Sequence, residues 1–327
     1  MKAVYIRSFG GPENLEIRDV PDPSPPVGSE VLVRVRAAGL NRADLLQRRG
    51  LYPPPAGYSP HIPGLEFAGE IVETGNDASA WKARDRVFGI SAGEAQAELL
   101  IADASVLAKI PDNLSFTEAA AVPEAFVTAH DAVFTQGELK KGETLLVHAV
   151  GSGVGLAALQ LAKAARAKTI GTSRTAEKLE RSKKFGLDEA ILTGENTEFA
   201  PILKSKNGGG VDVILDLVGA GYFRENLECL LPKGRLMLVG LTSGNSAMFD
   251  LSMALRKRLR IIGTVLRGRS VDEKAEATRL FAEQVVPLLA NGTVVPNVDK
   301  IFPVEKVREA HEYLESNESF GKIILEF

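Results

Sequence analysis

TLLVHAVGSGVGLAALQLAKAARA, residues 144–167, contains a short apolar run, a glycine-rich turn and a helix-forming segment in that order. A strand that leads through a tight glycine turn into a helix is typical of the first unit of a dinucleotide-binding sheet. Glycines let the backbone approach a pyrophosphate, and the helix N-terminus favours negative charge. The stretch therefore predicts a binding loop for an anionic group.

The segments that follow this loop alternate between buried strands and helices. The expected strands are TIGTSR (169–174), EAILT (189–193), DVILDLVG (212–219), RLMLVG (235–240) and RIIGTVL (260–266). Continuous apolar strands of this kind are buried on both faces, as in parallel sheets covered by helices. The sequence therefore predicts an α/β fold with a doubly wound parallel Rossmann sheet.

The first third of the chain has a different pattern, with short strands separated by proline and glycine. The expected strands are KAVYI (2–6), LEIRDV (15–20), EVLVRVRAAGL (30–40), GEIVETG (69–75) and DRVFGI (85–90). They predict an irregular β-rich domain. Ser115 and Glu118 form a capping box at the start of a helical segment, 115–136, with a break near Pro123.

The tail is expected to be helical from about residue 268 and to end in the strand GKIILEF (321–327). We expect this tail to return to the N-terminal domain. The predicted domains are thus 1–124 and 268–327 as the two parts of a β-rich domain, and 125–267 as the Rossmann domain.

Composition excludes several classes of protein. The formal net charge is −3, which gives no general attraction to nucleic acid or acidic membranes. Cys229 is the single cysteine, so neither a disulfide within the chain nor a multi-cysteine metal site can form. The N-terminus has no apolar core of a signal peptide, and no run of about 18 apolar residues occurs. A cytoplasmic protein is predicted.

The end of the second Rossmann strand indicates which dinucleotide binds. An NAD site usually has Asp or Glu there to hold the ribose 2′-OH. This chain has Thr172, Ser173 and Arg174, followed by Lys178. These side chains can hydrogen-bond a 2′-phosphate and balance its charge, which a carboxylate would repel. The sequence therefore favours NADPH over NADH.

Several long motifs in order resemble one known family across essentially the whole chain. They are GGPENLEI (10–17), AAGLNRADLLQRRGLYPPP (37–55), IPGLEFAGEIVETG (62–75), EAAAVPEAFVTAHDAV (118–133), HAVGSGVG (148–155) and the closing GKIILEF. The chain resembles the zeta-crystallin-like quinone oxidoreductases of the medium-chain dehydrogenase/reductase superfamily. The NRADLLQR and YPPP segments resemble its tumour-suppressor-inducible branch.

The resemblance implies a GroES-like catalytic domain completed by the tail, and NADPH bound in the cleft between the domains. It also implies quinones or other activated carbonyls and alkenes as substrates, and a homodimer. The cofactor-binding residues that it implies are Asn41, Thr128, Ala149, Ser152, Gly153, Val154, Gly155, Gly240, Leu241, Val265 and Lys322. Thr193 stands where many relatives have a tyrosine that helps to bind the 2′-phosphate.

The resemblance also implies a departure from the zinc alcohol dehydrogenases of the same superfamily, which bind a catalytic metal through two Cys and a His. At two of the corresponding positions this chain has Asn41 and Leu65 instead. With one cysteine and four histidines, no metal site of that kind is predicted. Without a Lewis acid the substrate must accept hydride readily, as quinones do. Asn41, Tyr52 and Ser152 are the predicted catalytic residues, the latter two as hydroxyls that contact the substrate.

Two other functions stay open. An enoyl or alkenal reductase would need a proton delivered to carbon, and Tyr52 is the candidate donor. An NADPH-binding structural or RNA-binding protein is the second alternative, but no basic and aromatic runs interleave. His148 is expected to be a core histidine, Glu66 a buried residue paired within the fold, and Cys229 a buried apolar residue.

Overall fold

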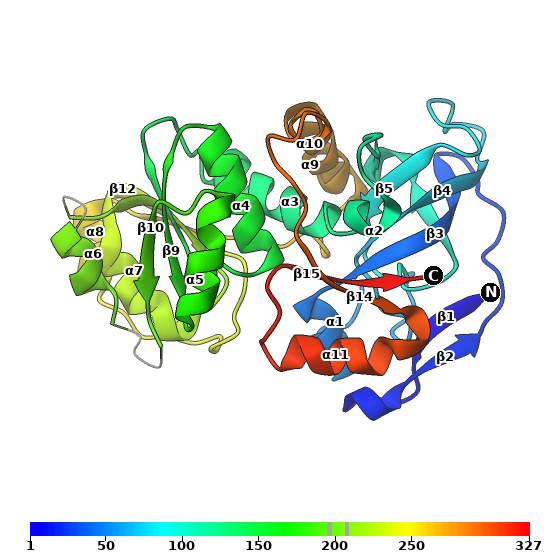
Figure 1. Ribbon diagram of the computed structural model, residues 1–327, viewed down its shortest axis with the longest axis horizontal. Helices are drawn as coiled ribbons and strands as arrows, with labels where there is room; N and C mark the ends of the chain where they lie inside the picture. Colours follow the sequence, from blue (N-terminus) through cyan, green and yellow to red (C-terminus); the bar gives the residue numbers. More distant parts are fainter. Residues whose placement is uncertain (195–197, 207–208) are drawn as a thin grey trace. The chain divides into compact units, whose positions relative to one another are not determined.

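The computed structural model describes residues 1–194, 198–206 and 209–327 (Figure 1). The chain divides into two compact units. Unit 1 comprises Met1–Val127 and Leu266–Phe327, and unit 2 comprises Thr128–Val265. The first boundary falls inside helix α3 (Pro123–His130), so the helix predicted for 115–136 contributes to both units.

Unit 2 contains a parallel sheet of six strands in the order β10-β9-β8-β11-β12-β13. The strands are β8 (Thr144–Val147), β9 (Lys168–Ser173), β10 (Glu189–Leu192), β11 (Val211–Asp216), β12 (Leu230–Leu238) and β13 (Arg260–Gly263). The strand order reverses between β8 and β11, which makes this a doubly wound sheet. The predicted Rossmann fold is confirmed.

Helices cover both faces of this sheet, with α4 and α5 on one side and α6, α7 and α8 on the other (Figure 1). Their bounds are α4 (Gly153–Ala164), α5 (Ala176–Ser182), α6 (Ala200–Lys206), α7 (Phe223–Cys229) and α8 (Leu251–Lys257), with η3 (Asp131–Gln136), η4 (Lys183–Phe185) and η5 (Ala220–Tyr222) as short helical turns. Leu146, Ile170, Ile214 and Leu236 form the centre of the core on strands β8, β9, β11 and β12.

Unit 1 is built on a β-sheet whose order is β14-β15-β3-β4-β5-β7, with β6 paired to β3. The strands are β3 (Glu30–Leu40), β4 (Glu66–Thr74), β5 (Arg86–Ile90), β6 (Leu99–Asp103), β7 (Leu107–Lys109), β14 (Val298–Pro303) and β15 (Lys322–Glu326); β1 (Lys2–Ile6) and β2 (Leu15–Asp19) form a separate antiparallel pair. The tail reaches this sheet because β15 pairs antiparallel with β3, Ile323 opposite Leu40.

The helices of unit 1 lie around this sheet. They are α1 (Arg42–Arg48), α2 (Phe116–Ala119), α9 (Val271–Gln284), α10 (Val286–Ala290) and α11 (Val307–Glu315), with η1 (Pro12–Asn14), η2 (Ala104–Val106) and η6 (Val304–Lys306). The capping box of Ser115 and Glu118 is confirmed at the start of α2. Among the described residues no helix is long and apolar enough to cross a bilayer.

Two features of the secondary structure differ from the prediction. In the 115–136 segment the predicted break near Pro123 is confirmed between α2 and α3, because proline cannot donate a hydrogen bond inside a helix, but the last turn, η3, is a π-helix that was not predicted. Strand β14 was expected to lie in a helical tail. Its only fully buried residue is Phe302, so the sequence lacks the alternation of a half-buried strand. Pairing with β15 makes it a strand.

Candidate functional site

The glycine-rich turn joins β8 to α4 at the carboxyl edge of the unit 2 sheet. Ser152 is the N-cap of α4, and its Oγ accepts a hydrogen bond from the Gly155 N–H at 3.1 Å. A Cβ at Gly155 would lie 2.6 Å from the Val150 carbonyl oxygen, so only glycine lets the helix start this close to the turn. The N–H groups of Gly153 and Val154 have no intrahelical acceptor in this first turn. They fit a pyrophosphate.

The predicted 2′-phosphate residues lie at the ends of β9 and β10. Arg174 follows β9 and is exposed, while Ser173 is buried. Thr193 is also buried, and its hydroxyl donates to the Ser173 carbonyl at 3.2 Å and accepts from Tyr222 at 2.9 Å. Thr193 therefore braces the end of β9. Lys178, in α5, is partly buried.

Three further predicted residues follow strands of the same sheet. Gly240 and Leu241 come after the end of β12, and Val265 after the end of β13. Because the strands are parallel, these positions share the carboxyl edge with the glycine-rich turn. Leu241 and Val265 are 54% and 53% exposed, so both can contact a ligand. Thr128, in α3, is buried.

His148, at the end of β8, belongs to a buried polar network rather than to a reactive centre. Its Nδ1 lies 2.8 Å from Thr172 Oγ1, and its Nε2 lies 2.6 Å from Asn226 Oδ1. Asn226 in turn donates to Asp216 at 3.0 Å. Burial lowers the pKa of His148, so the ring is neutral and satisfied. The expected core role is confirmed.

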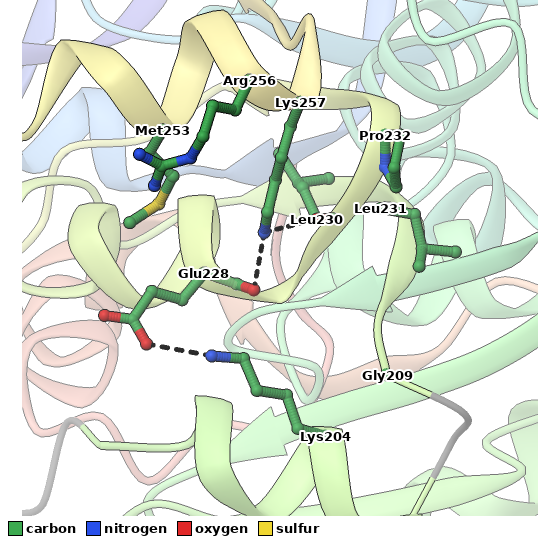
Figure 2. A pocket seen from close by; sticks show the side chains of 9 residues that line it. All are labelled: Lys204, Gly209, Glu228, Leu230, Leu231, Pro232, Met253, Arg256 and Lys257. Carbon is green, nitrogen blue, oxygen red and sulfur yellow. Dashed lines mark hydrogen bonds and ion pairs between the residues drawn. The ribbon is translucent and has the colours of Figure 1, made fainter.

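Unit 2 also holds a pocket of about 410 Å³ near the amino end of β12 (Figure 2). Figure 2 shows that Lys204, Glu228 and Lys257 of its lining interact with the protein itself. Lys257 Nζ donates to the carbonyls of Leu227, Glu228 and Leu230, and Lys204 pairs with Glu228 at 3.2 Å. Lys257 thus caps the C-terminal end of α7. The pocket lies at the opposite edge of the sheet from the glycine-rich turn.

The candidate site of unit 1 is organised around the Lys322 ammonium. Lys322 Nζ lies 2.5 Å from Glu66 Oε1, 2.7 Å from Asn41 Oδ1 and 3.0 Å from the Leu40 carbonyl oxygen. An ammonium has three N–H donors, so these three acceptors satisfy it fully. Both Lys322 and Glu66 are buried, with exposures of 5% and 0%. The expectation that Glu66 is paired within the fold is confirmed.

This arrangement fixes the orientation of the Asn41 amide. Lysine has no acceptor, so the atom of Asn41 that faces Lys322 must be Oδ1. Its Nδ2 then donates to Glu66 Oε1 at 2.8 Å. Asn41 is itself partly buried, at the point where β3 leads into α1. The predicted Lys322 and Asn41 are thus brought together, and the ammonium acts on Asn41 rather than as a free charge.

Two carboxyl groups beside this pair have perturbed protonation. Burial raises the pKa of Asp44 to about 6, although the main-chain N–H groups of Asn41 and Gly64 donate to it and oppose this rise. Burial, followed by the negative charge of Glu66, raises the pKa of Glu124 to about 8. The site therefore contains an acid that is protonated at neutral pH.

Tyr52 lies in the proline-rich loop after α1 and is partly buried. Arg267 stacks on its ring, 4.9 Å from the ring centre, and donates to the Tyr52 carbonyl oxygen at 2.8 Å. The same guanidinium also bonds the Ala92 carbonyl and the Gln47 side chain. Arg267 thus holds the loop against α1. Burial raises the pKa of the Tyr52 hydroxyl, which remains a donor at neutral pH.

Sequence reasoning missed three residues of this site: Asp44, Glu124 and Arg267. Asp44 stands within the NRADL motif, so the resemblance offered a signal for it. Glu124 stands within the motif over 118–133, so the resemblance offered a signal for it as well, whereas Arg267 lies outside the quoted motifs. Their significance depends on which side chains the fold places around them.

The donor set of this site does not fit a zinc ion. Asn41 offers an amide and Leu65 an aliphatic chain, and the Lys322 ammonium already lies between Asn41 and Glu66. Zinc sites in proteins use Cys, His and carboxylate ligands. Across residues 1–194, 198–206 and 209–327, no group of three or more His, Cys, Asp or Glu side chains is placed to hold a metal.

Two family models match the chain, one for each type of domain. The alcohol dehydrogenase GroES-like domain matches residues 28–131, and the zinc-binding dehydrogenase model matches residues 153–283. The chain is 32% identical to a quinone oxidoreductase of Pseudomonas aeruginosa, over 99% of both sequences. It is 33% identical to a human quinone oxidoreductase, over 99% of this chain and 97% of the relative.

Solved structures give the same relationship. The Escherichia coli quinone oxidoreductase complexed with NADPH superposes with a TM-score of 0.89 at 31% identity, over 100% of both chains. The apo form of the JamJ enoyl reductase superposes with a TM-score of 0.87 at 25% identity, over 99% of this chain and 98% of that chain.

Proposed function

Because this chain belongs to the zeta-crystallin-like quinone oxidoreductases of the medium-chain dehydrogenase/reductase superfamily, we propose that it reduces quinones with NADPH. The observation that carries the proposal is similarity over the full length to quinone oxidoreductases, one of them solved with NADPH. The glycine-rich turn and the exposed Arg174 after β9 support NADPH as the cofactor. NADPH, when bound, supplies a hydride.

The residues of the chain then have distinct tasks. Backbone N–H groups of Gly153 and Val154 would hold the pyrophosphate, and Arg174 with Ser173 the 2′-phosphate. In unit 1, the Asn41 amide is preset by Lys322 and Glu66. A preset polar group holds reacting atoms about 3–3.5 Å apart without reorganisation during the reaction. That the transfer occurs in a cleft between the units stays a prediction.

We propose that Tyr52 and Ser152 contact the acceptor through their hydroxyls. Ser152 Oγ accepts from Gly155, so its own hydrogen remains available to donate. The reaction is proposed to be independent of zinc, because the donor set around Asn41 does not suit that metal.

Enoyl or alkenal reduction is a second candidate, favoured by the full-length similarity to an enoyl reductase. The decisive assay measures oxidation of NADPH and NADH with 1,2- and 1,4-quinones, 2-alkenals and enoyl thioesters, before and after EDTA treatment. We expect turnover of quinones with NADPH that EDTA leaves unchanged. Turnover of alkenals or thioesters alone would show that these compounds, and not quinones, are the substrates. NADPH binding without any turnover would favour the alternative of an NADPH-binding structural or RNA-binding protein.

We also propose a homodimer formed through unit 2. Strand β13 lies at the edge of the sheet, and three exposed apolar side chains precede it in the chain: Met248 (96%), Leu251 (73%) and Leu255 (79%). Leu251 and Leu255 are four residues apart, so they share one face of α8. A second copy would cover both this face and the unpaired strand edge.

The mass in solution tests this interface. At micromolar concentration we expect light scattering to give about twice the chain mass of 35.0 kDa. Leu255→Lys should shift the mass toward one chain, because a buried unpaired charge is unfavourable. A single-chain mass for the unmodified protein would contradict the proposal.

A further inference from the structure

Glu124 is a carboxyl group of the candidate site to which the proposed hydride chemistry assigns no task. It is the second residue of α3, and its main-chain N–H donates to Glu66 Oε2 at 2.8 Å. Glu66 Oε1 in turn holds Asn41. Glu66 therefore links Glu124 to the Asn41 amide, which the proposed function assigns to the reacting centre. The side chain of Glu124 is only partly buried and keeps access to solvent.

The surroundings of the Glu124 carboxyl disfavour a negative charge. The charged or titratable groups that interact electrostatically with this carboxyl are Asp44 of α1, Tyr52, Glu66 of β4, Arg267, Lys274 of α9 and Lys322 of β15. Glu66 and Asp44 repel a third carboxylate. The ammonium of Lys322 and the guanidinium of Arg267 are already committed to other acceptors.

The positive charges of Lys322 and Arg267 oppose this repulsion only in part, since the pKa of Glu124 is raised overall. Among the residues that the structure describes, no hydrogen bond or ion pair reaches the Glu124 carboxyl. Burial and the charge of Glu66 raise its pKa to about 8, from an ordinary value of 4.5. Glu124 therefore carries a proton at neutral pH and can release it at small cost.

The other two carboxyl groups are less suited to give up a proton. Glu66 accepts from Lys322, Asn41 and the Glu124 main chain, which holds it as a carboxylate. Asp44 accepts from two main-chain N–H groups and is 1% exposed, so it has no route to solvent for a new proton.

We propose that the Glu124 carboxyl is the proton donor to the reduced substrate, an inference that rests on the quinone reduction proposed above. Hydride transfer moves two electrons and one proton to the quinone and leaves a hydroquinone anion. The O–H bond of Glu124 breaks, and a new O–H bond forms on the quinolate oxygen. The Glu124 carboxylate then takes a proton from water through its exposed part, which restores the protonated acid for the next turnover.

The pH dependence of kcat for a 1,4-quinone at saturating NADPH tests this role. For the unmodified protein we expect a constant kcat up to about pH 8 and a fall above it, because the acid form is lost. In Glu124→Gln we expect kcat at pH 7 to be lower by about 100-fold and to show no fall near pH 8. NADPH affinity should not change.

Glu73→Gln is the matched control, since Glu73 is an exposed glutamate on β4 of the same unit. It should behave like the unmodified protein. If Glu124→Gln keeps the original kcat and pH profile, the proton-donor role is overturned while quinone reduction stands. If the unmodified protein reduces no quinone at any pH, the proposed function fails, and this inference fails with it.

The free energy of unfolding gives a readout that does not depend on turnover. The folded protein keeps a proton that an ordinary glutamic acid releases near pH 4.5. Stability should therefore fall as the pH rises from about 4.5 to about 8. Glu124→Gln should lack this component. An identical pH dependence in both proteins overturns the proposal. Should the variant not fold, a wild-type kcat that stays constant above pH 8 overturns it equally.

Discussion

Lys322→Met is expected to destabilise unit 1 by about 3–5 kcal/mol, the usual cost of removing one partner from a buried ion pair. Glu66 is 0% exposed and would keep a negative charge with no cation beside it. Asn41 would also lose the donor that fixes its amide, so quinone turnover should fall together with stability. Chemical denaturation and steady-state kinetics measure the two effects.

Two further variants separate the charge from the packing. In Glu66→Gln combined with Lys322→Met, the buried charge is gone, and we expect part of the lost stability to return. Lys109→Met removes an exposed lysine of β7 and should change stability by no more than about 0.5 kcal/mol. Unchanged stability in Lys322→Met would mean that Glu66 is not held as a carboxylate, which would contradict our description of the site.

Arg174→Ala is expected to weaken NADPH binding by about 10- to 150-fold and to leave NADH binding nearly unchanged. A charged hydrogen bond to a phosphate contributes about 1.5–3 kcal/mol, and NADH has no 2′-phosphate to receive it. Arg174 follows β9 at the carboxyl edge of the sheet and is exposed, so its removal should not disturb the fold. Fluorescence titration with each nucleotide gives the two dissociation constants.

Arg166→Ala is the matched control for this experiment. Arg166 is also exposed, but it precedes β9 and so lies at the opposite edge of the same sheet. It removes the same charge from unit 2 without touching the predicted phosphate site. Equal losses of NADPH and NADH affinity in Arg174→Ala would show that the arginine does not read the 2′-phosphate.

Residues 144–167 predicted the Rossmann unit together with the apolar strands that follow them, because a glycine turn that opens a repeated series of buried strands and helices is typical of a parallel sheet. The long strand over 30–40 was likewise predicted with its bounds, since β-branched residues alternate along it. Cys229 is buried as its type suggests. The local sequence pattern was sufficient to predict secondary structure and burial wherever the side chains of one segment decide its conformation.

Tertiary structure alone decided what surrounds Asn41. Lys322 lies 281 positions away from Asn41 in sequence, and it reaches the amide only because β15 pairs with β3. Glu124 looks like any acidic residue in a first helical turn, yet the fold places its main-chain N–H against Glu66, whose negative charge raises the pKa of the Glu124 carboxyl. Protonation depends on burial and on neighbouring charges, and neither is a property of the local sequence.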